Sequence, residues 1–184
     1  VQIDGGCCKV SLPIHHAIKV ELWLFGVPLS FFGNQPENST EILPLLRKLN
    51  LSKSSKVHEV WQGQFEYPIS NLTAYLVKVL RADSNGNSIA EWILDPFARN
   101  SLGGELWGKI ITFEVDEKIG MMRAIFERDK PLSKISLGHL RRVALLTDIE
   151  RVRIESARFS RKSLGELVIY ECHVRGMTQH HSSR

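Results

Sequence analysis

Three side chains that could take part in acid–base chemistry stand together in the stretch LVIYECHVRGMTQHH (Leu167–His181). The period of two in a β-strand puts Glu171, His173 and Arg175 on one face. A carboxylate, an imidazole and a guanidinium in one row can form a satisfied buried network, or can approach a substrate near Arg175. We favour the network, because Glu171 has no second carboxylate beside it with which to share general acid–base work.

Histidine and cysteine are the other candidates for chemistry, as metal ligands. The adjacent pairs His15–His16 and His180–His181 would splay apart on a strand, and neither pair has an evident third ligand. The three cysteines, Cys7–Cys8 and Cys172, lack the spacing of a metal site and are an odd number for a disulfide framework. The sequence therefore predicts no metal, no cofactor and a reducing compartment.

The positive charge is concentrated in one stretch. The chain carries +4 at neutral pH, and residues His139–Lys162 supply it with seven Arg or Lys against three acids. Such a stretch (Arg141–Lys162) could bind nucleic acid, with an affinity that falls steeply with salt. The charges interleave, however, and no aromatics alternate with them, so a solvated face or linker is the favoured interpretation. No apolar run approaches the roughly 20 residues that span a bilayer.

The first half of the chain reads as a series of short strands. Alternation and β-forming residues predict strands over Lys19–Phe25, Val57–Tyr67, Thr73–Ala82 and Ile89–Asp95. A turn is predicted over Asp83–Ser88, with Asn85-Gly86 at its tip. In the second strand Trp61 and Phe65 fall on one face.

The remaining segments give weaker patterns. The stretch Ser39–Asn50 predicts a brief helix capped by Ser39 or Thr40, although Pro44 falls inside it. Residues Pro96–Lys109 look like a loop, and Ile111–Asp129 predicts one or two further strands.

Four stretches resemble the isoamylase-type debranching enzymes of glycogen and starch, in order and spacing. KVELWLF (Lys19–Phe25) resembles an early strand of their family-48 carbohydrate-binding module, and EVWQGQF (Glu59–Phe65) is similar to its Val-Trp-His-Gly strand. WILDPFAR (Trp92–Arg99) is similar to the Leu-Asp-Pro-Tyr-Ala-Arg that closes the module. VIYECHVRGMT (Val168–Thr178), which includes Tyr170, agrees at nine of eleven positions with the strand that opens the catalytic barrel.

The resemblance implies a mostly β fold: an immunoglobulin-like β-sandwich of the carbohydrate-binding type over residues 1–100, a connector over 101–166, and the first strand of a truncated (β/α)8 barrel over 167–184. Two stretches depart from the family pattern. GGCCKVSLP (Gly5–Pro13) stands where the module has its first strand, and VRIESARFSRKS (Val152–Ser163) stands just before the barrel strand. They bear on the edge of the sandwich and on its docking against the barrel. In this family the catalytic carboxylates lie on later strands, so the chain is expected to be inactive alone. Cytoplasm, or plastid stroma in a plant or alga, is the implied location.

A carbohydrate-binding module stacks sugar rings on exposed aromatic side chains. The candidates taken from the resemblance are Trp61, Tyr75 and Trp92, against the alternative that most aromatics form the sandwich core. The implied partner is glycogen or starch, with a catalytically active homologue as a further candidate. Three alternatives stay open: a stand-alone glucan-binding or regulatory module, a basic nucleic-acid-binding protein, and a decayed reading frame.

Overall fold

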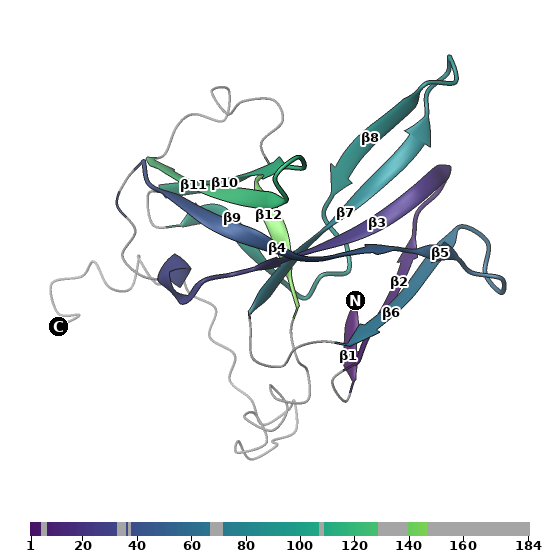
Figure 1. Cartoon of the computed structure of the whole chain (residues 1–184), viewed down its shortest axis with the longest axis horizontal. Helices are drawn as coiled ribbons and strands as arrows, with labels where there is room; N and C mark the ends of the chain where they lie inside the picture. Colours follow the sequence, from purple (N-terminus) through teal and green to yellow (C-terminus); the bar gives the residue numbers. More distant parts are fainter. Residues whose placement is uncertain are drawn as a thin grey trace, which may run out of the picture. The chain divides into compact units, whose positions relative to one another are not determined.

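A computed structural model describes residues 1–4, 7–32, 36, 38–66, 72–106, 109–128 and 140–146 (Figure 1). These residues form strands and one 3-10 helix, and no helix among them is long and apolar enough to cross a membrane. The elements are β1 (Gln2–Asp4), β2 (Cys7–Pro13), β3 (Ala17–Gly26), η1 (Leu29–Phe32), β4 (Thr40–Asn50), β5 (Ser52–Lys53), β6 (Val60–Glu66), β7 (Thr73–Ala82), β8 (Ser88–Ile93), β9 (Asn100–Leu106), β10 (Lys109–Asp116), β11 (Met121–Arg128) and β12 (Arg142–Leu145).

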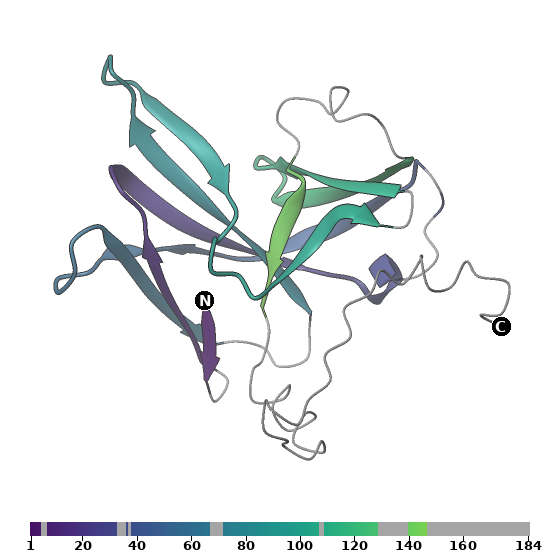
Figure 2. The same ribbon diagram turned by 180° about the vertical axis from the view of Figure 1, so that it is seen from behind.

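The strands form two antiparallel sheets, as the sequence predicted. The smaller sheet has the order β1-β2-β6-β5, and the larger has the order β12-β9-β10-β11-β4-β3-β7-β8. In addition β12 pairs with β7, so the larger sheet closes on itself and leaves β8 as an extension. Seen from behind, β12 runs beside β9 (Figure 2). The sequence did not predict this closure.

Two hydrophobic cores follow from this arrangement. The first lies between the smaller sheet and one face of β3 and β7, where Trp61 and Phe65 pack with Leu22 and Val77. The predicted alternation of β6 is confirmed, since Trp61 and Phe65 are buried while Gln62 is exposed. The second core fills the closed part of the larger sheet, and each strand of that ring contributes to it.

Three segments differ from the sequence prediction. Thr40–Asn50 is strand β4 and not a helix, because it finds backbone partners on both sides, in β3 and β11. Residues Asn100–Leu106 are strand β9 and not part of a loop. The drifted stretch around Cys7–Pro13 still makes strand β2, which pairs with β1 and β6.

The part of the predicted connector that the structure describes is built into the larger sheet. Strand β11 pairs with β4 and strand β12 pairs with β7, so strands β9 to β12 belong to the same sheet as β3, β4 and β7. The predicted barrel strand, with Tyr170, Glu171, His173 and Arg175, lies outside the described residues, as does the basic stretch beyond Leu146.

Candidate functional site

Two of the three predicted sugar-binding aromatics are core residues. Trp61 is 5% exposed and its Nε1 donates a hydrogen bond of 3.3 Å to the Ile14 carbonyl. Tyr75 is 2% exposed and its hydroxyl donates to Asp95 Oδ2 at 2.7 Å. Burial raises the pKa of Tyr75, and the hydrogen bond with Asp95 raises it further. Neither ring offers a face to a sugar, so both assignments are corrected to structural roles.

Trp92 is placed differently, on β8, where its side chain is partly exposed. Its ring meets Trp23 of β3 edge to face, with centroids 5.1 Å apart and an interplanar angle of 89°. This is a favourable geometry for an aromatic pair, and it fixes the orientation of the Trp92 indole. Of the three candidates, only Trp92 is partly exposed.

A buried carboxylate lies on the same sheet face as Trp23. Lys19, Glu21 and Trp23 alternate along β3 and so point to one side of the sheet. Glu21 is only 5% exposed; its Oε1 lies 2.6 Å from Lys19 Nζ and 3.3 Å from Lys48 Nζ. Its Oε2 accepts a hydrogen bond of 3.0 Å from Trp23 Nε1. The carboxylate is thus held by three donors from two strands.

These contacts decide the charge state of Glu21. Burial raises the pKa of the carboxyl, but hydrogen bonds from Lys19, Trp23 and Lys48 lower it by more, so the pKa lies below its ordinary value of 4.5. Glu21 is therefore an anion at neutral pH, and its oxygens can accept hydrogen bonds from a ligand.

Two lysine ammonium groups lie near the tryptophan pair. Lys48 Nζ lies 4.7 Å from the centroid of the Trp23 ring, and Lys78 Nζ lies 5.9 Å from Trp23 and 5.6 Å from Trp92. These are cation–π distances. Lys78 also forms an ion pair with Glu117, which the turn between β10 and β11 supplies.

A hollow of about 230 Å³ opens on this face, lined by Lys19, Glu21, Lys48, Lys78 and Leu80. Lys78 lines the hollow and also lies beside the partly exposed indole of Trp92. We call this set the Trp92 face; its members are Lys19, Glu21, Trp23, Lys48, Lys78, Leu80 and Trp92. An aromatic surface beside ammonium donors and a carboxylate acceptor suits a polyhydroxylated ligand. Within the described residues, no group of three or more His, Cys, Asp or Glu could hold a metal ion.

Sequence reasoning found Trp92 but missed Glu21 and its lysines. The alternation of Lys19, Glu21 and Trp23 was a usable signal for a shared face. The other two partners come from strand register, which pairs Trp23 with Lys48 and Glu21 with Lys78. Register of this kind depends on which strands pair, and the sequence had predicted a helix where Lys48 lies.

Acid should weaken the contribution of Glu21 to stability. Because the folded-state pKa lies below 4.5, the ion pairs stabilise the fold fully above that value, and the effect is lost as pH falls through the folded pKa. Glu21→Gln should lower the free energy of unfolding at pH 7, and its difference from wild type should shrink as the pH falls below 4.5 and through the folded-state pKa. Urea unfolding followed by tryptophan fluorescence at several pH values measures this.

The control for that titration is Glu114→Gln, because Glu114 is an exposed partner of Arg123 at 3.0 Å. Exposed pairs contribute about 0–1 kcal/mol, so this variant should differ little from wild type at any pH. A Glu21→Gln difference that does not shrink as the pH is lowered, over the whole acid range in which the wild-type chain stays folded, would contradict the assignment.

In comparisons with family models, curated proteins and solved structures, the chain shows no match.

Proposed function

We propose that this chain is the N-terminal, non-catalytic portion of an isoamylase-type glycogen or starch debranching enzyme, and that its Trp92 face binds α-glucan. The family assignment is supported by the order of the four resembling stretches. The glucan-binding role is supported chiefly by one observation, the partly exposed indole of Trp92 beside the Glu21 and lysine cluster.

The arrangement accounts for glucan binding in physical terms. The apolar face of a glucose ring stacks on the exposed surface of Trp92, as carbohydrate CH groups do on aromatic rings. Hydroxyl groups then donate to the ionised Glu21 and accept from the lysine ammonium groups. No step of hydrolysis is assigned to this chain, because the resemblance places the paired carboxylates of retaining hydrolysis on barrel strands beyond it.

The positions of the resembling stretches support the same proposal. KVELWLF lies within β3, EVWQGQF ends within β6, and WILDPFAR runs from β8 into the following turn. In that turn Asp95 is 2% exposed, and it accepts hydrogen bonds from Tyr75 and from the backbone N–H of Phe97 at 2.9 Å. The motif aspartate therefore has a structural role in the module.

Native affinity electrophoresis through gels with and without glycogen tests the proposal. Wild-type chain should be retarded by glycogen, and soluble maltooligosaccharide should reverse the retardation. Trp92→Ala should weaken the apparent affinity at least about tenfold, which corresponds to about 1.4 kcal/mol, while keeping a folded circular-dichroism spectrum.

The matched control is Phe97→Ala, since Phe97 is 66% exposed and lies outside the Trp92 face. This variant should bind glycogen like wild type. Unchanged mobility of the folded wild-type chain in glycogen would contradict the binding role, and equal retardation of Trp92→Ala would remove the site from this face.

A further inference from the structure

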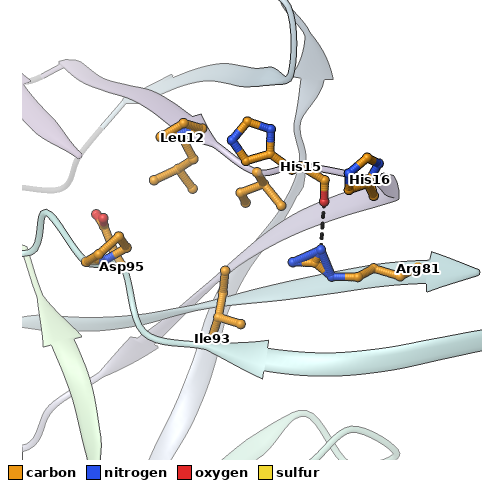
Figure 3. A pocket seen from close by; sticks show the side chains of 9 residues that line it. Leu12, His15, His16, Arg81, Ile93 and Asp95 are labelled. Carbon is orange, nitrogen blue, oxygen red and sulfur yellow. Dashed lines mark hydrogen bonds between the residues drawn. The ribbon is translucent and has the colours of Figure 1, made fainter.

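A second hollow, separate from the Trp92 face, lies where the end of β2 and the turn after it approach β7 and the end of β8 (Figure 3). Its volume is about 230 Å³, and it is lined by Leu12, Pro13, Ile14, His15, His16, Arg81, Ile93, Asp95 and Pro96. Neither the sequence resemblance nor the glucan-binding proposal assigns it a role.

The floor of this hollow is apolar. Leu12 and Ile14 are 2% and 5% exposed, and Ile93 is partly buried beside them. Pro13 and Pro96 add carbon surface at the sides. The volume exceeds the roughly 150 Å³ of a cavity that takes benzene, and it is below the roughly 300 Å³ at which drug-sized sites begin. A body of about six carbon atoms therefore fits, by the same comparison.

Arg81 sets the polarity at the rim. Its Nη1 donates to the His15 carbonyl at 2.7 Å (Figure 3). Its Nε donates to Glu91 Oε1 at 2.9 Å. These two bonds fix the plane of the guanidinium. A guanidinium has five N–H donors, so three are without a protein partner within the part of the chain that the structure describes. Such donors suit a carboxylate or a phosphate.

The one buried acid of the hollow is already satisfied. Asp95 accepts from the Tyr75 hydroxyl and the Phe97 backbone, and its Oδ2 lies 3.3 Å from the amino nitrogen of Val1. Its charge is thus balanced within the protein. The imidazoles of His15 and His16 lie at the rim as further donors. Among the residues that the structure describes, the only acid paired with Arg81 is Glu91, whose side chain is 46% exposed.

We propose that this hollow, the Arg81 pocket, binds a small amphiphilic acid. The apolar body of the ligand rests on Leu12, Ile14 and Ile93, and its single anionic group, a carboxylate or a phosphate, accepts hydrogen bonds from Arg81. A glucan is a poor fit here, because the floor has no groups to bond with its hydroxyls. The proposal stands independently of the glucan-binding function.

Hexanoate is the probe. Hexanol keeps its apolar chain without the charge, and inorganic phosphate offers an anion without an apolar chain. Methyl NMR of the 184-residue chain, observing Ile14 and Ile93, should show saturable shifts with hexanoate. Arg81→Gln should weaken hexanoate binding at least tenfold without changing the weaker response to hexanol. Glu91→Gln should tighten hexanoate binding, because it removes a carboxylate that competes for the guanidinium.

Arg123→Gln is the matched control, since Arg123 lies on β11 and pairs with Glu114; it should bind hexanoate like wild type. The proposal is overturned if Ile14 and Ile93 do not respond to hexanoate, or if Arg81→Gln binds it as wild type does. Phosphate that binds as tightly as hexanoate would also overturn it, because the apolar floor would then contribute nothing.

Discussion

Gly103→Ala is expected to destabilise the fold by roughly 3–5 kcal/mol, the sum of backbone strain and a steric clash. Gly103 has a φ of +97°, a region that L side chains rarely adopt. An added Cβ would lie 2.4 Å from Phe113 Cε2 and 2.5 Å from the carbonyl oxygen of Arg141. The second of these neighbours is backbone, so it cannot move aside without shifting the start of β12.

The matched control is Gly86→Ala. Gly86 has a φ of +80°, but nothing lies within 4 Å of the added Cβ. Gly86→Ala should therefore lower the free energy of unfolding only by the backbone strain, about 1–2 kcal/mol. The difference between the two variants, read from urea unfolding midpoints, therefore isolates the clash. Equal losses would mean that β9 and β12 do not approach as closely as the structure has them.

The Gly103 prediction tests the closure of the larger sheet, which could not be predicted from the sequence. The closure of the larger sheet depends on β12 pairing with both β9 and β7, and these strands are far apart along the chain. Nothing in the local pattern of Gly103 and Gly104 distinguishes a loop from a strand in which glycine allows another backbone to approach. A loop and such a strand differ only in whether a distant strand pairs with the segment.

The residue pattern predicted a strand correctly where one face of the strand is exposed to solvent and the other is buried. In β6 the alternation of Trp61 and Phe65 with exposed glutamines leaves one consistent solution. In β4 the leucines cluster, as in Leu45 and Leu46, and such a run fits a helix as well as a strand. Tertiary pairing with β3 and β11 decided the outcome.

The candidate site, too, could be predicted from the sequence only in part. A tryptophan can be proposed as a sugar contact from sequence, and Trp92 was. Whether an aromatic is exposed cannot be read from its type, however, so Trp61 and Tyr75 were proposed on equal terms. The smaller sheet buries Trp61 and Tyr75 in the first core, whereas Trp92 packs against the second core and stays partly exposed.

Trp61→Ala should be the second large loss, about 3–5 kcal/mol, as is usual when a buried tryptophan is truncated. The indole fills the core between the two sheets, and its N–H is bonded to the Ile14 carbonyl. Trp92→Ala should cost clearly less, because its side chain is already partly exposed. Urea unfolding of both variants under the same conditions gives the comparison, and a smaller loss for Trp61→Ala than for Trp92→Ala would contradict it.

Trp61→Phe separates stability from binding. It keeps most of the buried ring and removes the N–H bond to Ile14, so it should lose about 1–3 kcal/mol and remain folded. If Trp61 has only a structural role, the folded variant should bind glycogen as wild type does, whereas Trp92→Ala should not. Loss of glycogen binding in folded Trp61→Phe would instead place the sugar contact near the smaller sheet, and the Trp92 face would lose its assigned function.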